Sequence, residues 1–192
     1  MSHNVGEEIA GLYLQIERGC DFVQYNLYTP DVQGEIDVVA VNFTARIVYI
    51  CEVAVHLVTG LQYVKGARPD TLDRFLKKFN KDIDYAEKAF PDFDRRYMLW
   101  SPIVKSAGPA AKYDQMKAVQ DVQRQIRAGR GVEIDLVVNE AFRDVLMRLK
   151  AYARTRTEEL KSPVLRLLQI DALLESHIQR GEKRAKAKDN SK

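Results

Sequence analysis

The sequence of 192 residues is poor in several features, and each shortage excludes a class of protein. Its two cysteines, Cys20 and Cys51, have neither the density of a disulfide framework nor metal-ligand spacing, so we expect buried thiols. No apolar run approaches the ~20 residues that span a bilayer, which excludes an integral membrane protein. The first residues, MSHNVGEEIAG, lack the basic start and apolar middle of a signal peptide, so we expect a cytoplasmic protein with no membrane partner.

Common catalytic and binding motifs are also missing. The chain contains no GxxxxGK[ST] phosphate loop, no G-x-S-x-G nucleophile elbow and no Cys/His cluster of zinc spacing. It shows no internal repeat. These absences argue against P-loop nucleotide-binding proteins, serine hydrolases with a nucleophile elbow and proteins with such a zinc site.

Net positive charge is absent from most of the chain and is concentrated at its end. Residues 176–192 contain six Lys or Arg and two acidic residues, whereas the other 175 residues contain 24 basic and 25 acidic ones. Residues 179–192 have almost no apolar content, so we expect a basic, disordered tail after a single domain spanning residues 1–178. Such a tail could neutralise nucleic-acid phosphates or only keep the protein soluble, and the sequence leaves both open.

Hydrophobic periodicity predicts an alternation of helices and strands. Helices are expected at 7–18, 71–90, 113–128, 140–156 and 163–179, and strands at 22–28, 35–42, 46–55, 97–104 and 132–138. The strands at 35–42 and 46–55 are rich in Val and Ile and are separated by a short turn, which indicates an antiparallel pair. This order predicts an α/β protein with a mixed sheet covered by helices.

Each strand of that pair carries one carboxylate among apolar residues. Alternation puts Asp37 on the same face as Val39, and Glu52 on the same face as Ile50. A carboxylate on a packed face is costly unless it is paired or binds a cation. Two of them on neighbouring strands repel each other, so Mg²⁺ or Mn²⁺, which prefer oxygen ligands, would compensate both. The alternative is that the strands end at the sheet rim, where each carboxylate is solvated or salt-bridged.

The segments around these carboxylates resemble a known metal-binding motif. GEIDVVAV, followed by a hairpin and an apolar run into CEV, resembles the motif of the PD-(D/E)XK nuclease superfamily. Upstream, GEEIAGLYLQIERGCDFVQYNLYTPDVQGEID is similar to the start of small bacterial nucleases related to archaeal Holliday junction resolvases, where a helix E-x-x-A-x-x-Y-L precedes G-E-I-D. The resemblance covers residues 6–56 and implies a restriction-endonuclease-like mixed central sheet flanked by helices.

The resemblance also implies an activity and a set of site residues. The activity is metal-dependent hydrolysis of DNA by an endonuclease that uses Mg²⁺ or Mn²⁺. Asp37 matches the central metal ligand of the family and Glu52 matches the second ligand. Glu7 matches the helix glutamate that helps to bind the metal or its water, and Glu8 could take that role if the helix were rotated.

The chain departs from the superfamily pattern at one position. The superfamily has Glu-x-Lys, in which the lysine positions or activates the attacking water, whereas here Glu52 is followed by Val53 and Ala54. Either a lysine reaches the site from elsewhere or the site does not cleave. The downstream candidates are Lys65, Lys77, Lys78 and Lys81. Lys78 ranks first as a catalytic residue because it borders the apolar stripe of its helix, so its stem can pack while its amine reaches the sheet.

Two other interpretations stay open. The first is a catalytically inactive nuclease-fold module that binds nucleic acid or a partner protein, and Ala54 is its main support. The second is a structural or assembly domain, which the nearly neutral charge outside the tail favours. The C-terminal helices offer a candidate homodimer face, through an apolar stripe that could equally belong to the core. That stripe consists of Leu165, Leu168, Ala172 and Leu173. His56, two residues after Ala54, could assist the chemistry or be structural.

Overall fold

The chain folds into two compact units, which we describe separately. The structure, a computed structural model, describes residues 4–28, 34–108 and 113–189. One unit is Met1–Arg143 and the other is Asp144–Lys192, whereas the sequence suggested one domain up to residue 178. The helices are α1 (Val5–Arg18), α2 (Thr71–Ala89), α3 (Gln115–Arg130), α4 (Glu140–Arg154) and α5 (Pro163–Asp189). The strands are β1 (Phe22–Tyr28), β2 (Glu35–Asn42), β3 (Ile47–Val53), β4 (Val64–Lys65), β5 (Arg68–Pro69), β6 (Asp94–Ser101) and β7 (Ile134–Val138).

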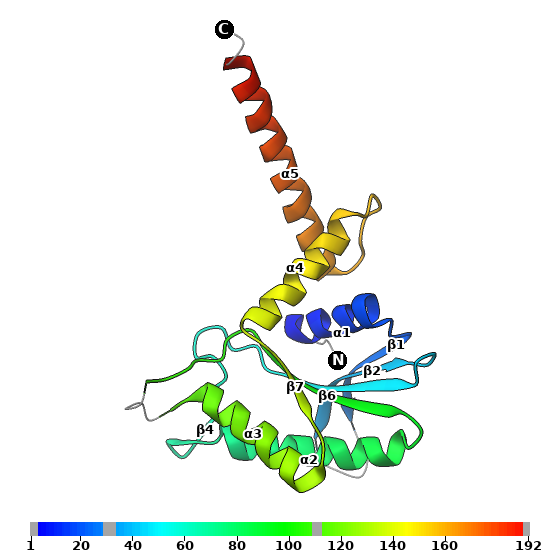
Figure 1. The fold of residues 1–192 in the computed structure, drawn as a ribbon, viewed down its shortest axis with the longest axis vertical. Helices are drawn as coiled ribbons and strands as arrows, with labels where there is room; N and C mark the ends of the chain where they lie inside the picture. The colour runs from blue at the N-terminus through cyan, green and yellow to red at the C-terminus, as the bar shows by residue number, and fades with distance from the viewer. Residues whose placement is uncertain (1–3, 29–33, 109–112, 190–192) are drawn as a thin grey trace. The chain divides into compact units, whose positions relative to one another are not determined.

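Five strands of the first unit form one mixed sheet in the order β1-β2-β3-β6-β7 (Figure 1). The pairs β1–β2 and β2–β3 are antiparallel, and Val38 lies opposite Cys51 in the second of them. The pairs β3–β6 and β6–β7 are parallel. The predicted antiparallel pair and the predicted α/β class are therefore confirmed. β4 and β5 form a separate short hairpin in a segment where no strand was predicted.

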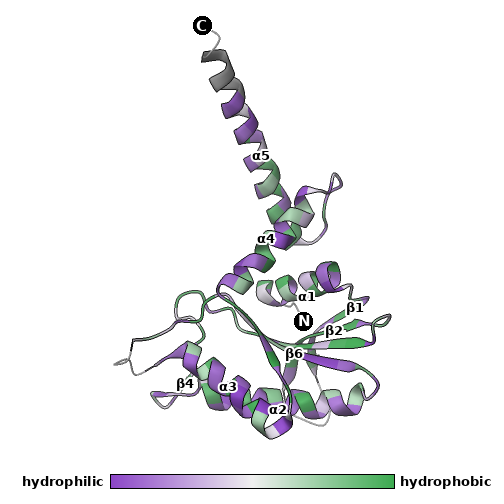
Figure 2. Cartoon of the chain, in the orientation of Figure 1, coloured by the Kyte–Doolittle hydropathy of each residue, from purple (hydrophilic) through white to green (hydrophobic). Residues whose placement is uncertain are grey.

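Helices cover both faces of this sheet. α1 lies against β1, β2 and β3 on one face, and α2 and α3 pack beside each other on the opposite face (Figure 1). In α2, Phe75, Phe79, Ile83 and Ala86 recur at helical spacing, and all four are buried. They join the inward side chains of β2, β3 and β6 in the main core. Along α2 and α3, hydrophobic and hydrophilic residues alternate, as expected for helices that pack through one face (Figure 2).

Two of the boundaries that differ from the sequence expectation have a clear physical reason, the start of β6 and the end of α5. β6 starts at Asp94 rather than Tyr97, because its first three residues pair with β3, and this pairing outweighs their poor strand propensity. α5 continues to Asp189 rather than ending near Gln179, so most of the segment expected to be disordered is helical. The reason is its composition, since GEKRAKAKD is largely Ala, Lys, Arg and Glu, which favour helices. The last three residues of that segment lie outside the described residues.

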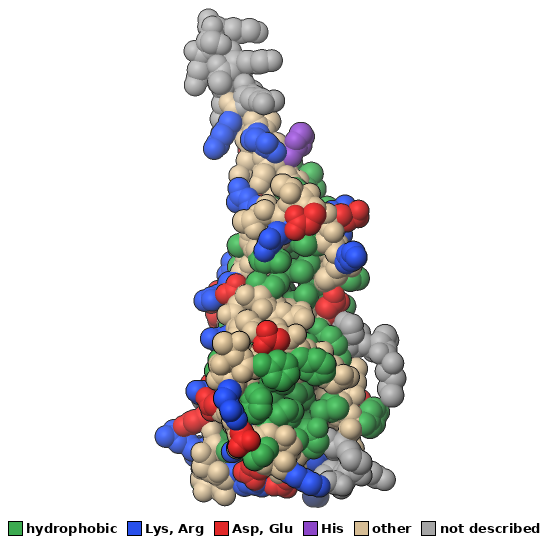
Figure 3. All heavy atoms as spheres, turned by 90° about the vertical axis from the view of Figure 1, so that its right-hand side faces the viewer, with side chains coloured by type: hydrophobic (Ala, Val, Ile, Leu, Met, Phe, Trp, Pro, Cys, Tyr) green, Lys and Arg blue, Asp and Glu red, His purple; other side chains and the backbone are tan. Residues whose placement is uncertain are grey.

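Aromatic side chains join two segments, the loop between α2 and β6 and the turn between β2 and β3. The rings of Phe43 and Phe93 meet edge-on with centroids 6.5 Å apart, and those of Phe93 and Phe90 with centroids 5.9 Å apart. Phe43 nevertheless remains 58% exposed. Figure 3 views the molecule from the side toward which this turn projects in Figure 1 and shows hydrophobic side chains gathered on the first unit.

The second unit contains α5 and most of α4. Lys150 of α4 forms ion pairs of 2.7 Å with Asp171 and 2.9 Å with Glu175, both in α5. In the apolar stripe of α5, Ala172 is buried whereas Leu173 is 46% exposed, so the stripe is only partly core. Within the described ranges, no helix is both long enough and apolar enough to cross a membrane.

A substitution at Gly11 tests how closely α1 approaches the sheet. A Cβ at this position would lie 2.2 Å from the hydroxyl oxygen of Tyr25 and 2.7 Å from its Cζ. Gly11→Ala should destabilise the fold by about 1–3 kcal/mol, because displacing a packed ring outweighs the ~1 kcal/mol that alanine contributes to a helix. Gly129→Ala in α3 is the matched control, since nothing lies within 4 Å of its added carbon, and it should raise stability slightly. Urea denaturation measures both, and equal effects would contradict the close approach of α1.

Candidate active site

Asp37 and Glu52 lie side by side on adjacent strands of the sheet. Because Val38 is opposite Cys51, one further step along β2 and β3 brings the two carboxylates to facing positions. The Asp37 carboxylate accepts a hydrogen bond of 2.7 Å from the backbone N–H of Val53. Asp37 is 6% exposed and Glu52 is fully buried. Both therefore lie on a packed face, as the alternation predicts, and both are paired with Lys78 rather than solvated, so the salt-bridged form of the alternative is also present.

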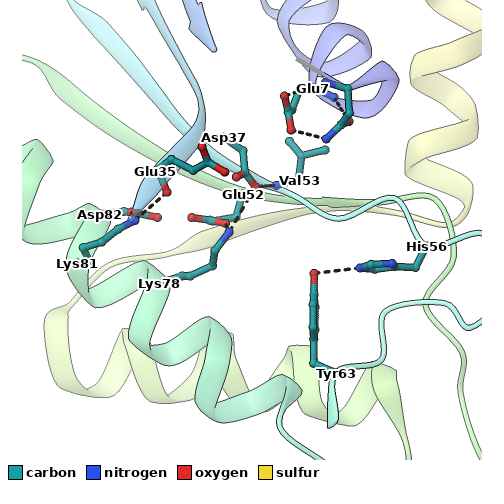
Figure 4. A network of polar contacts seen from close by, with 11 residues as sticks. Glu7, Glu35, Asp37, Glu52, Val53, His56, Tyr63, Lys78, Lys81 and Asp82 are labelled. Atoms are coloured by element: carbon teal, nitrogen blue, oxygen red, sulfur yellow. Dashed lines mark hydrogen bonds and ion pairs between the residues drawn. The ribbon is translucent and has the colours of Figure 1, made fainter. Parts of the chain in front are cut away.

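Lys78 of α2 reaches both carboxylates from the helix that covers this face (Figure 4). Its Nζ donates a hydrogen bond to Glu52 Oε2 and lies 3.5 Å from Asp37 Oδ2. Burial lowers the pKa of Lys78, but the charges of Glu52 and Asp37 outweigh burial and raise that pKa above its ordinary value. The structure thus brings together the three residues that the sequence analysis placed in the catalytic site, and Lys78 stays protonated between the carboxylates.

Asp82 is a buried site residue that the sequence analysis missed. It lies one helical turn after Lys78 in α2, it is fully buried, and its Oδ1 is 3.2 Å from Nζ of Lys81. Lys81 also donates a hydrogen bond of 2.8 Å to the backbone carbonyl of Glu35 at the start of β2. The available signal was the one that identified Asp37, because Asp82 also interrupts an apolar stripe, between Phe79 and Ile83. Lys81 therefore holds β2 and Asp82 rather than the carboxylate pair.

The carboxyl groups of Glu52 and Asp82 resist ionisation. Burial raises the pKa of Glu52 well above its ordinary value, the charges of Asp37 and Asp82 raise it further, and Lys78 opposes the change. Burial also raises the pKa of Asp82, although the Glu52 carboxyl and Lys81 act in the other direction. No described residue donates a hydrogen bond to Glu52 Oε1. The pocket around Glu52 consequently favours a proton or a further cation.

Glu7 lies close enough to Asp37 to affect the same electrostatics, but its carboxylate already has partners. It accepts a hydrogen bond of 3.0 Å from the backbone N–H of Asn4, while the Asn4 side chain accepts one from the N–H of Glu7, which is a capping box at the start of α1. Burial raises the pKa of Glu7, and the charge of Asp37 adds to the rise. The structure places Glu7 beside the site as the N-terminal cap partner of α1.

Asn26 of β1 is a partner of Glu7 that sequence reasoning did not find. A hydrogen bond from its side chain lowers the pKa of Glu7. The β1–β2 register places Tyr25 opposite Val38 and Leu27 opposite Ile36, so Asn26 lies across from Asp37, where the pairing is interrupted. Asn26 also has a positive φ of 49°, which asparagine tolerates better than most residues. The local backbone therefore deviates at the position facing Asp37.

His56 belongs to a neighbouring polar group rather than to the carboxylate pair. Its Nε2 lies 3.1 Å from the hydroxyl of Tyr63, and the two rings meet edge-on (Figure 4). The guanidinium of Arg74 stacks over the Tyr63 ring at 4.3 Å from its centroid. These contacts support a structural role for His56.

A groove opens beside Lys78 along α2. It has a volume of about 600 Å³. Its basic residues, which define what we call the α2 groove, are Lys65, Arg74, Lys77, Lys78 and Lys81. Four of them recur at helical spacing on one face of α2, and Lys65, Arg74 and Lys77 are exposed. Asp70 and Asp73 lie at the helix start, so the basic charge is concentrated toward the carboxylate pair.

The donor set at the carboxylate pair suits a hard divalent cation. Asp37 and Glu52 supply oxygen ligands, and Glu52 Oε1 has no donor among the described residues. Mg²⁺ typically uses one or two carboxylates and completes its shell with water and phosphate oxygens. Among the residues that the structure describes, no group of three or more His, Cys, Asp or Glu side chains is arranged to hold a metal. A bound ion would therefore depend on Asp37, Glu52 and non-protein oxygens.

Comparison with protein-family models, with curated proteins and with solved structures gave no match to this chain. The resemblance to the PD-(D/E)XK superfamily accordingly stays a prediction.

Glu52→Gln tests whether burial raises the pKa of Glu52. Because burial raises the pKa of Glu52 above the ordinary 4.5, the wild-type fold loses stability as pH rises from 4.5 through the raised pKa, whereas glutamine does not titrate. The variant should match the wild type near pH 4 and should be the more stable of the two at pH 8. Thermal denaturation across this range measures the difference. Glu133→Gln, at an exposed ion pair with Arg127, should show no such trend. A Glu52→Gln variant that is less stable at pH 8 would contradict the expectation.

Proposed function

We propose that this protein is a metal-dependent endonuclease that hydrolyses phosphodiester bonds in DNA. The observation that carries the proposal is the meeting of Asp37, Glu52 and Lys78 at one buried point between the sheet and α2. Two carboxylates and one amine form a donor set for a divalent ion and for phosphate oxygens. The sequence resemblance points to Asp37 and Glu52 independently of this geometry, whereas Lys78 was predicted from its position beside the apolar stripe of its helix.

Each residue of the proposed site has a separate role. Asp37 and Glu52 would hold the ion, which supplies a polarised phosphate oxygen and an activated water when it is bound. Lys78 donates hydrogen bonds and positive charge to the phosphoryl oxygens as negative charge develops on them. The Val53 N–H fixes the orientation of the Asp37 carboxylate, because that hydrogen bond is 2.7 Å long. Lys81 holds Asp82 and the start of β2 in place.

The geometry also favours catalysis over the inactive-module alternative. That alternative depends on Ala54, which is buried and supplies no polar side chain. Lys78 brings an ammonium group to the same carboxylates from α2, so the chemical role of the missing lysine has a candidate. We therefore prefer hydrolysis to the inactive-module alternative, because Lys78 brings the ammonium group from α2 that Ala54 cannot supply.

A long polyanion is the substrate class that fits the surroundings. The α2 groove places the exposed cations of Lys65, Arg74 and Lys77 next to the proposed reaction centre. Phosphates on either side of a cleaved bond would lie along such a row of charges. DNA is the substrate that the sequence resemblance implies.

Cleavage assays test the proposal directly. With Mg²⁺ or Mn²⁺, the protein should nick plasmid DNA, and Asp37→Asn or Lys78→Met should each reduce the rate at least ~100-fold, since each removes a group that binds the ion or the developing charge. Lys117→Met, at an exposed lysine of α3 paired with Asp121, should cut like the wild type. Cleavage that survives Asp37→Asn would refute this site. Binding without cleavage at any metal concentration would favour the inactive module.

Salt dependence tests the groove. In an Asp37→Asn background that blocks cutting, Lys65→Gln, Arg74→Gln and Lys77→Gln should each weaken DNA binding and reduce the slope of log affinity against log salt by about 1, because each removes one phosphate contact. Fluorescence anisotropy at several salt concentrations gives the slopes. Arg124→Gln, at an exposed arginine of α3, is the control. Unchanged slopes in all three groove variants would place the DNA elsewhere.

A further inference from the structure

Lys78 is in contact with two groups at once. Its ammonium group contacts Glu52 and lies 3.5 Å from Asp37, so it occupies the space between the two carboxylates. The same side chain lines the α2 groove and is 28% exposed. A lysine stem has four rotatable bonds, so the amine can move from the carboxylates into the groove without any movement of the backbone of α2.

We propose that Lys78 is an internal counterion that a divalent metal displaces, so that the metal takes the carboxylates and the ammonium group turns into the α2 groove. The contacts favour this exchange, because the ammonium group contacts Glu52 Oε2 and lies 3.5 Å from Asp37 Oδ2, which is the position that a divalent ion bridging these two oxygens would take. The inference rests on the proposed function for the identity of the ion and adds how the ion enters the site.

The exchange couples two binding events. When the metal binds, the positive charge of Lys78 is released from Asp37 and Glu52 and becomes available to an anion in the groove. A phosphate backbone in the groove likewise attracts Lys78 away from the carboxylates and leaves them free for the metal. By linkage, each ligand increases the affinity of the site for the other by the same factor. The ligand class that the displaced amine receives is a phosphodiester backbone.

Metal binding in the absence of DNA tests the competition. Isothermal titration calorimetry with Mn²⁺ should give an affinity at least ~10-fold higher for Lys78→Met than for the wild type, because the competing cation has been removed. Lys77→Met is the matched control, since it removes an equal charge from the neighbouring exposed lysine of the same groove, and it should change the affinity by no more than about twofold. Equal affinities of the two variants, or weaker binding by Lys78→Met, would overturn the proposal.

A second measurement uses the unaltered protein, because Lys78→Met leaves buried carboxylates unpaired and its folding could suffer. The wild type is treated briefly with an amine-acetylating reagent with and without Mn²⁺, and the modified lysines are quantified by mass spectrometry. Mn²⁺ should increase the labelling of Lys78 at least ~3-fold relative to Lys77, because the displaced amine is no longer held by the carboxylates. Labelling of Lys78 that is unchanged or reduced relative to Lys77 would overturn the proposal.

The outcomes distinguish a failure of the Lys78 exchange from a failure of the proposed hydrolysis. If Mn²⁺ displaces Lys78 but no DNA is cut, the exchange stands and hydrolysis is refuted. If Mn²⁺ supports cutting while Lys78→Met binds Mn²⁺ no more tightly than Lys77→Met, hydrolysis stands and the exchange is refuted. If neither the wild type nor Lys78→Met binds Mn²⁺, the exchange is refuted without any assay on DNA.

Discussion

The constraint on which this structure depends is the burial of three carboxyl groups against an apolar layer. Asp37, Glu52 and Asp82 are all less than a tenth exposed, and water cannot compensate charge there. Two lysines of α2 reach in instead, Lys78 to the strand pair and Lys81 to Asp82. A buried ion pair seldom contributes as much stability as a well-packed apolar pair of the same volume. The ion pairs of Lys78 and Lys81 are therefore a weak source of stability for this core.

The fold supplies the rigid support that such a site needs. The two carboxylate strands lie at positions two and three of a five-strand sheet, with hydrogen-bonded neighbours on both sides and helices on both faces. The aromatic stripe of α2 packs on that sheet and fixes the rotation of the helix, which in turn fixes the direction in which its lysines point. Deviations from regular backbone are local, and one of them, at Asn26, lies across from Asp37.

Much of the fold could be predicted from periodicity, and so could the carboxylate pair. Alternating Val and Ile residues indicated the hairpin of β2 and β3, and a carboxylate in each apolar run identified Asp37 and Glu52. Lys78 followed from its place beside an apolar stripe. Asp82 was missed because a single acidic residue on a helix is usually solvated, and only tertiary packing shows that this one is buried. The extension of α5 was missed because high charge indicates disorder while the same residues have high helix propensity.

The placement of the lysine on a helix, instead of on the strand beside Glu52, has a consequence for when the site first exists. The hairpin of β2 and β3 carries Asp37 and Glu52, whereas α2 carries Lys78, so neither segment contains all three site residues. During synthesis the hairpin leaves the ribosome first, and its acidic residues have no amine partner until α2 has emerged and docked. Completion of the site is thus a tertiary event, so a nascent or partly unfolded chain lacks the arrangement that the folded protein presents.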